Sequence, residues 1–276
     1  MNVANRVALV VNPKRAAASE LAEKARTWWE ERGYAVVIDD GLGAPGVGSK
    51  DLDFAISLGG DGTMLRTVQL VLERRVPVLG VNFGNLGYLT QVEPSGLSEA
   101  FDRLVAREFD IEERMTLLLA VTSLGEQRTL VALNEVVLEK GAPGHTVHVA
   151  VAIKDRPFLT YVADGIIVAT PTGSTAYNLS ARGPIVSPSL RAIVMTPISP
   201  HMLFDRSLVL EPDETVGLEL LDGPTAVLSV DGSMLVPVTI DDRVRIGAGP
   251  TPARIVRFGR PDFHAILRAK FALADR

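Results

Sequence analysis

The chain contains no cysteine, which excludes disulfide bonds and metal sites built from thiolates. Basic residues are in the minority, with 28 Lys and Arg against 33 Asp and Glu, and no basic run is present to neutralise a phosphodiester backbone. The longest apolar runs, such as residues 116–121 and 165–169, are far shorter than the ~20 residues of a membrane-spanning helix. Residues 1–6 lack the charged and then apolar pattern of a signal peptide. We therefore expect a cytoplasmic protein that binds neither nucleic acid nor membrane.

Histidine is scarce as well. The four histidines are dispersed along the chain, so we expect no metal site that is held by the protein itself. The chain does have length and apolar content: its 276 residues are 47% hydrophobic, enough to bury the core of one large domain or of two ordinary ones. Chemistry on a small molecule is the class of function that these features favour.

The first hundred residues alternate between strand and helix patterns. Short apolar runs indicate buried strands, and apolar residues at helical spacing follow most of them, with strands expected at 6–11, 34–38, 54–58 and 77–81 and helices at 16–32, 63–73 and 97–107. This order predicts a Rossmann-like α/β domain with a parallel sheet over residues 1–108. Residues 41–46 match the dinucleotide fingerprint G-x-G-x-x-G, but they follow the second strand and open no helix, so we interpret them as a surface loop.

The pattern changes at about residue 109. Strand signals now recur every 8–12 residues with turns between them, one of them a single long strand over 128–138, and helical spacing is scarce. A β-sandwich-type domain is therefore expected over 109–250, interrupted by one short helix near 174–179. Residues 251–276 carry apolar side chains at helical spacing from 262 to 274 and are expected to pack back on the first domain. The predicted fold class is α/β plus mostly β.

One stretch in the first domain combines three glycines with a carboxylate. Residues 59–63 read Gly-Gly-Asp-Gly-Thr and lie where a buried strand turns into a helix. Glycine allows positive φ and removes the Cβ atoms that would keep a phosphate from the backbone, while the first N–H groups of a helix attract an anion. The phosphate-loop residues expected on these grounds are Gly59, Gly60, Gly62 and Thr63. Arg66, on the first turn after the loop, is a further candidate to reach a phosphate, and an exposed helix residue is the alternative.

Asp61 is the unusual member of this stretch. A carboxylate in an anion cradle repels its ligand unless a metal ion or a hydroxyl proton lies between them, so Asp61 is a candidate base or metal partner. The alternative is a plain strand-to-helix turn in which Asp61 or Thr63 caps the helix. A second glycine-rich turn, residues 82–89, follows the next strand and falls at the same edge of a parallel sheet, or is an ordinary loop.

Two polar stretches stand out in the second domain. Asn134 and Glu135 follow an apolar strand and offer the donor and acceptors that suit neighbouring sugar hydroxyls, provided that the strand end bends there; a solvated strand end is the alternative. Residues 161–184 are dense in small and hydroxyl residues. Within them Thr175 presents a hydroxyl at a helix start, Tyr177 a flat face for a base, and Asp164 an acceptor for an amide.

Taken together, these motifs resemble the NAD kinase family, whose members use ATP or polyphosphate. The resemblance rests on residues 59–63, 134–135, 172–181 and 196–201, which occur in family order and extend over roughly residues 6 to 270. The Gly-Gly-Asp-Gly-Thr element alone is shared with lipid kinases and, in a related form, with phosphofructokinases. The Asn-Glu pair and the Thr-Ala-Tyr-Asn run make the resemblance specific.

The resemblance implies transfer of a phosphate from ATP, or from polyphosphate, to the 2′-hydroxyl of the adenosine ribose of NAD, which yields NADP. Asp61 would then lie at that hydroxyl as base or orienter, and Mg²⁺ or another divalent cation would be carried by the phosphate donor. The NAD-binding residues implied are Asn134 and Glu135 at ribose hydroxyls, Thr175, Ala176, Tyr177 and Ser180 around the adenosine, and Asp164 at the far end of the dinucleotide. A homodimer or homotetramer is implied as well.

The chain departs from the family pattern at Arg182, where many members have glycine; a side chain there could alter a loop or a subunit contact. Two other functions compete with the kinase of NAD. A lipid or diol kinase would need an apolar acyl pocket, whereas the second domain offers polar turns. A non-catalytic NAD(P)-binding sensor would have no need of Asp61 beside the phosphate path.

Overall fold

The computed structural model describes residues 5–41, 51–84, 87–123, 126–142, 144–222, 225–260 and 262–273. The chain divides into two compact units, one made of Met1–Glu113 with Ala253–Arg276 and the other of Arg114–Pro252. Each unit has a hydrophobic core of its own. The boundaries expected from the sequence, after residues 108 and 250, lie a few residues before these divisions.

The first unit is built on a six-stranded sheet with the strand order β2-β1-β3-β4-β18-β5. Its strands are β1 (Arg6–Val11), β2 (Ala35–Asp39), β3 (Phe54–Gly59), β4 (Val78–Asn82), β5 (Asp110–Arg114) and β18 (Ala253–Arg257). The pairs β1–β2, β1–β3, β3–β4 and β4–β18 are all parallel. The predicted α/β domain with a parallel sheet is therefore confirmed.

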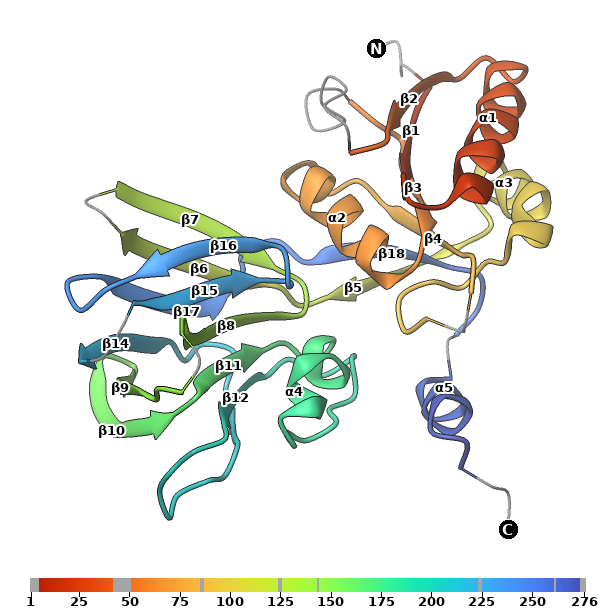
Figure 1. Cartoon of the computed structure of the whole chain (residues 1–276). Helices are drawn as coiled ribbons and strands as arrows, with labels where there is room; N and C mark the ends of the chain where they lie inside the picture. The colour runs from red at the N-terminus through yellow and green to blue at the C-terminus, as the bar shows by residue number, and fades with distance from the viewer. Residues whose placement is uncertain are drawn as a thin grey trace. The chain divides into compact units, whose positions relative to one another are not determined.

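Helices cover both faces of this sheet. They are α1 (Ala16–Glu30), α2 (Asp61–Val71), which continues into the short 3-10 helix η2 (Leu72–Arg74), and α3 (Leu97–Val105), which follows η3 (Pro94–Gly96). Figure 1 shows α1 and α3 on one face and α2 on the other. On the α1 face Trp29 is fully buried and its ring centroid lies 5.0 Å from that of Phe101 in α3. This packing leaves the start of α2 at the carboxyl end of β3, where the glycine turn lies.

The C-terminal segment belongs to the first unit, as predicted, but a strand makes the return. Strand β18 pairs with β4 and buries Val256 in the core of the first unit. The helix expected over residues 262–274 is α5 (Phe263–Lys270), with Asp262 as a cap whose Oδ1 accepts from the Ala265 N–H at 3.0 Å. None of the eight residues of α5 is buried. Among the described residues, no helix is long and apolar enough to cross a membrane.

The second unit contains two six-stranded sheets with the orders β10-β9-β14-β17-β6-β7 and β13-β12-β11-β8-β15-β16. Its elements are β6 (Leu117–Ser123), β7 (Glu126–Ala132), β8 (Glu135–Lys140), β9 (Val147–Ile153), β10 (Arg156–Ala163), β11 (Gly165–Ala169), η4 (Gly173–Thr175), α4 (Tyr177–Ser180), β12 (Ile193–Ile198), β13 (Leu208–Leu210), β14 (Val216–Asp222), β15 (Ala226–Val230), β16 (Met234–Val238) and β17 (Arg243–Ala248). Neighbouring strands pair antiparallel, for example β8 with both β11 and β15. The predicted β-rich domain is confirmed.

The prediction of a single long strand over residues 128–138 is wrong. The chain bends at Leu133 and Asn134, so that β7 ends in one sheet and β8 begins in the other. Apolar residues lie on both sides of Asn134 and Glu135, and the stretch contains neither glycine nor proline, which is why the strand pattern was extended across the bend. The bend places Asn134 and Glu135 at the transition between two sheets.

Candidate active site

The glycine turn of the first unit lies where β3 ends and α2 begins. Gly59 is the last residue of β3, Gly60 is the N-cap, and α2 starts at Asp61, two residues before the start expected at Thr63. The N–H groups of Thr63 and Met64 both donate to the Gly60 carbonyl oxygen, at 3.0 and 3.1 Å. The N–H groups that precede them at the helix start have no partner within the helix and are available to an anion.

The absence of a Cβ atom, and not a positive φ, is what the glycines contribute to this turn. Gly59, Gly60 and Gly62 are not among the glycines with φ in the left-handed region, contrary to one of the reasons expected for them. A Cβ at Gly59 would collide with the Thr63 side chain, which packs beneath it. A Cβ at Gly60 or Gly62 would meet no other atom of the described residues within 4 Å. Gly59 thus serves the fold, whereas Gly60 and Gly62 leave the backbone open to a ligand.

Asp61 is held by the segment that follows β4. Its Oδ2 accepts a hydrogen bond from the Tyr88 N–H at 3.1 Å and its Oδ1 one from the Leu89 N–H at 3.3 Å. A Cβ at Gly87 would lie 2.5 Å from Asp61 Oδ1, so only glycine allows this approach. The second glycine-rich turn therefore touches Asp61, although its residues Asn85 and Leu86 lie outside the described part of the chain, as do residues 42–46 of the loop expected at 41–46.

Tyr88 adds an aromatic ring beside this carboxylate. Burial and the negative charge of Asp61 raise the pKa of the Tyr88 phenol. The Lys270 ammonium group lies over the same ring, 4.6 Å from its centroid. On the side of residues 87–89, Asp61 is thus surrounded by backbone N–H groups and by the Tyr88 ring with its Lys270 partner.

The Arg66 side chain, on helix α2, points to the carboxyl ends of β1 and β2. Its Nη2 donates to the carbonyl oxygens of Val11, the last residue of β1, at 2.8 Å and of Asp39, the last residue of β2, at 3.3 Å. The same nitrogen lies 3.3 Å from Asp39 Oδ1, which forms an ion pair. These bonds engage much of the guanidinium group, and contact with a phosphate stays a prediction.

In the second unit the bend at Asn134 and Glu135 is held by a residue that the sequence did not single out. The Asp231 carboxylate accepts from the N–H groups of Leu133 at 2.8 Å, Asn134 at 2.8 Å and Glu135 at 3.1 Å. Asp231 lies in the turn between β15 and β16, with φ +48°, which aspartate tolerates better than most residues. The Asp-Gly pair at 231–232 signals a hairpin, but nothing in the sequence links that hairpin to the bend.

Glu135 is the buried carboxyl group of this site. It is 6% exposed, and its Oε2 has no hydrogen-bond partner among the described residues. Burial and the nearby charge of Asp231 raise the pKa of Glu135 to about 8, although a hydrogen bond from the Tyr177 backbone acts in the opposite direction. Near neutral pH the side chain therefore holds a proton, and it can both donate to and accept from a hydroxyl group.

The turn that carries Thr175 and Ala176 packs directly on this bend. The Thr170 N–H donates to the Asn134 carbonyl oxygen at 2.8 Å, and a Cβ at Gly173 would collide with the Asn134 backbone. The Thr175 hydroxyl donates to the Thr172 carbonyl oxygen at 3.2 Å, a hydrogen bond within its own turn. The structure thus brings the two polar stretches of the second domain together.

Tyr177 and Asp164 lie in a second polar group. Tyr177 is 39% exposed, and its hydroxyl lies 3.5 Å from Glu139 Oε2. Burial, Glu139 and Asp164 together raise the pKa of the Tyr177 phenol. Asp164 accepts from Lys140 Nζ at 2.6 Å, a partner that the sequence prediction did not include.

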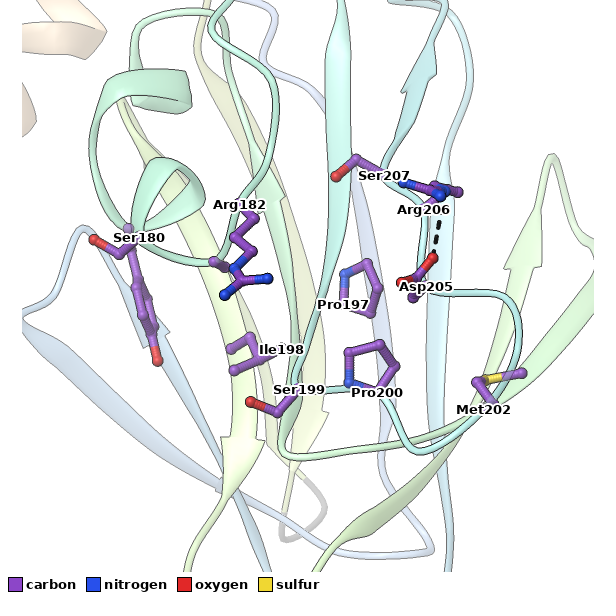
Figure 2. Close-up of a pocket in the computed structure, with 12 residues that line it drawn as sticks. Ser180, Arg182, Pro197, Ile198, Ser199, Pro200, Met202, Asp205, Arg206 and Ser207 are labelled. Carbon is purple, nitrogen blue, oxygen red and sulfur yellow. Dashed lines mark ion pairs between the residues drawn. The ribbon is translucent and has the colours of Figure 1, made fainter.

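A cavity of about 690 Å³ adjoins this group, and Tyr177 and Ser180 line one side of it. The opposite side is made by residues 197–200 and 205–207 (Figure 2). Arg182 reaches towards Ile198 and Ser199 in this view and has φ +65°, a conformation that favours glycine. This explains physically why glycine suits the position, and it places the Arg182 side chain in the cavity wall.

The carboxylates and histidines of the described residues form no group of three that could hold a metal ion. Asp61 alone supplies one carboxylate, far fewer oxygen ligands than the six that Mg²⁺ takes. These residues therefore favour Asp61 as a base or orienter.

The chain is similar to known proteins over nearly its whole length. The family model of the ATP-NAD kinase N-terminal domain matches residues 47–109, and that of the ATP-NAD kinase C-terminal domain matches residues 133–258. The NAD kinase of Heliobacterium modesticaldum is 41% identical over 275 residues, which cover 96% of this chain and 97% of the relative. The NAD kinase of Symbiobacterium thermophilum is 39% identical over 277 residues, covering 96% and 98%.

Two solved structures share the fold. Yeast NADH kinase complexed with NADH superposes with a TM-score of 0.88 at 23% identity and covers 100% of this chain and 89% of its own, a likeness of fold alone. An NAD kinase from Archaeoglobus fulgidus in complex with ATP has a TM-score of 0.77 at 25% identity and covers 96% and 99%.

The two family models together match more than half of the chain, and the curated relatives span nearly all of it. The protein is therefore an enzyme of the kinase class. More closely, the chain belongs to the NAD kinase family, and the resemblance inferred from its motifs is confirmed.

Proposed function

We propose that this kinase transfers the γ-phosphoryl group of ATP to the 2′-hydroxyl of the adenosine ribose of NAD, giving NADP and ADP. The 2′-oxygen forms the new bond to phosphorus while the bond between the γ-phosphorus and the bridging oxygen breaks, and its electrons leave with ADP. The hydroxyl proton passes to the Asp61 carboxylate. Such a transition state needs positioning and charge neutralisation more than a strong base.

The observation that carries this proposal is the carboxylate of Asp61 at the first turn of α2. Two backbone N–H groups orient it, at 3.1 and 3.3 Å, and the neighbouring residues Gly60 and Gly62 leave the backbone open. Phosphate oxygens would bind to the N–H groups of this turn, with Gly59 and Thr63 forming its packed side and Arg66, on the next turn of α2, supplying a guanidinium group.

For the second unit we propose the NAD-binding roles that the resemblance implies. Asn134 and the protonated Glu135 would bind ribose hydroxyls, since together they offer donors and acceptors at one buried bend. The adenosine would lie against a set of residues from η4, α4 and the turn between them, namely Thr175, Ala176, Tyr177 and Ser180. Asp164 would bind the far end of the dinucleotide, in exchange for or together with Lys140.

Magnesium would enter as a complex with ATP, where it neutralises charge on the phosphates. The residues that would face it are the open glycines and Asp61. The cytoplasmic location and the assembly into a homodimer or homotetramer stay predictions, and light scattering coupled to gel filtration tests the second.

The direct test of the proposal is a donor comparison with purified protein. NADP formation from NAD is measured with Mg-ATP and with polyphosphate, and ADP formation is followed in parallel. We expect one ADP for each NADP with ATP as donor. NADP from polyphosphate alone would replace ATP in the proposal, whereas NAD binding without NADP from either donor would contradict it.

A further inference from the structure

The last strand of the first unit ends beside the segment that holds Asp61. Strand β18 lies next to β4 in the sheet, and its final residue, Arg257, is only 3% exposed. A buried guanidinium is costly unless its N–H groups are paired, so its partners indicate what the residue does.

Arg257 donates in two directions. Its Nε donates to Glu112 Oε2 in β5 at 2.7 Å, and its Nη1 donates to the Leu89 carbonyl oxygen at 3.0 Å. The Glu112 side chain is 21% exposed against 4% for Arg257, so the pair is shielded from solvent mainly on the arginine side. Because the guanidinium group is planar and rigid, pairing with Glu112 fixes its plane and directs the second nitrogen at Leu89.

Leu89 is also one of the two residues whose N–H groups bind Asp61. The Leu89 N–H donates to Asp61 Oδ1 at 3.3 Å, and the Leu89 carbonyl oxygen accepts from Arg257 Nη1. A continuous line of contacts therefore joins Glu112, Arg257, the backbone of Leu89 and the Asp61 carboxylate. All four residues belong to the first unit.

The end of β18 holds the same segment at a second point. Phe258 follows Arg257, and its backbone N–H donates to Gln91 Oε1 at 3.1 Å. Gln91 Nε2 in turn donates to the Phe258 carbonyl oxygen at 3.4 Å. Leu89 and Gln91 are thus attached to the end of β18 by Arg257 and Phe258. Of these two, only Arg257 bonds to a residue that donates to Asp61.

We infer that Arg257 is a positioning residue for phosphoryl transfer: it fixes the Leu89 backbone and, through it, the orientation of the Asp61 carboxylate. The inference rests on the proposed role of Asp61. Arg257 touches no substrate in this account, so its loss changes turnover and leaves the binding of NAD and ATP nearly unaltered. Misplacement of a reacting group by about 1 Å can cost roughly a hundredfold in rate.

Four variants test this inference. Arg257→Met should lower kcat by roughly tenfold to a hundredfold while the KM values for NAD and ATP change by about twofold at most. Arg257→Lys keeps a charge beside Glu112 and should restore part of the loss. Arg254→Met is the matched control, because Arg254 lies on the same strand and donates to the Arg75 carbonyl oxygen at 2.9 Å, away from Asp61; its kcat should stay unchanged. If Arg257→Met does not fold because Glu112 is left unpaired, the double variant Arg257→Met, Glu112→Gln removes the Glu112 charge. The double variant is then measured in place of the single one.

A double-mutant cycle with Asp61→Asn separates positioning from general damage. If Arg257 acts through Asp61, Arg257→Met costs little further kcat once Asp61 is already asparagine. An equal fractional loss in both backgrounds, or full turnover of Arg257→Met, overturns the inference while the proposed function stands. Full turnover of Asp61→Asn alone overturns the proposed role of Asp61 instead, so the two failures are distinguished.

Discussion

Among single residues, Glu135 makes the free energy of unfolding depend on pH. The folded protein keeps a proton on Glu135 up to a pKa of about 8, because burial and Asp231 disfavour its charge, whereas the unfolded chain loses that proton near 4.5. Between these values the folded state binds more protons, so the free energy of unfolding falls as the pH rises. The buried side chain thus lowers the stability of the fold as the pH rises from about 5 to about 8.

The variant Glu135→Gln removes this dependence. The wild type should lose stability relative to the variant by about 1 kcal/mol per pH unit between about pH 5 and pH 8. Urea unfolding of both proteins at several pH values measures the difference, in which the titrating groups that are not coupled to Glu135 cancel. Parallel stability curves for the two proteins would show that Glu135 has an ordinary pKa.

Some single residues of the site could not be found from the sequence. Asp61 and Glu135 belong to short motifs whose residue types already indicate their chemistry. Asp231 and Arg257 do not, because each acts through backbone groups far away: Asp231 lies 98 residues from Leu133, and Arg257 lies 168 residues from Leu89. Only the pairing of β15 with β8 and of β18 with β4 brings them there.

At the scale of elements, the turn from β3 into α2 separates a folding role from a binding role. Gly59→Ala should lower stability by about 1–3 kcal/mol, since its Cβ collides with Thr63. Gly60→Ala meets no such obstacle in the described residues, and its φ of −111° suits alanine. It should leave the melting temperature nearly unchanged and raise the KM for ATP roughly tenfold, because it obstructs a hydrogen bond to a charged phosphate.

Thermal unfolding and steady-state kinetics of these two variants check the expectation. If Gly60→Ala binds ATP as the wild type does, the turn is scaffold and no phosphate approaches its backbone at that residue.

The hairpin turn between β15 and β16 is the second element with a separable role. Asp231→Asn keeps a residue that tolerates positive φ but replaces one accepting oxygen with a donor, so it should cost about 1–3 kcal/mol and raise the KM for NAD. Asp242→Asn is the control, because Asp242 also holds a turn in this unit, accepting from the Thr239 N–H at 2.7 Å. We expect similar losses of stability but an altered KM in Asp231→Asn alone. An unchanged KM there would remove the bend from the NAD site.

Elements were predicted well where their periodicity is strong and less well where tertiary contacts decide. The alternation in the first hundred residues predicted the parallel sheet, and the strand signals of the second domain predicted its β structure. The strand expected over 128–138 failed because Asp231, from a distant hairpin, bends the chain at Asn134. Helix α5 was found, but its apolar spacing overstated its burial.

For the whole molecule, the account predicts how the metal behaves. Since the described carboxylates and histidines form no cluster for a cation, Mg²⁺ should be needed for turnover and not for the fold. Dialysis against a chelator should abolish NADP formation and leave the melting temperature and NAD binding unchanged, with full activity on addition of Mg-ATP. A fall in melting temperature on chelation would reveal a resident metal ion.

Whether Asp61 takes part in the transfer of phosphate to NAD can be decided with one variant, Asp61→Asn. The turnover of Asp61→Asn is compared with the wild type under saturating NAD and Mg-ATP, and calorimetry measures the affinity for NAD in both. The account predicts a kcat lower by roughly a hundredfold to ten-thousandfold with NAD affinity retained. A variant that binds NAD and turns over like the wild type would contradict it.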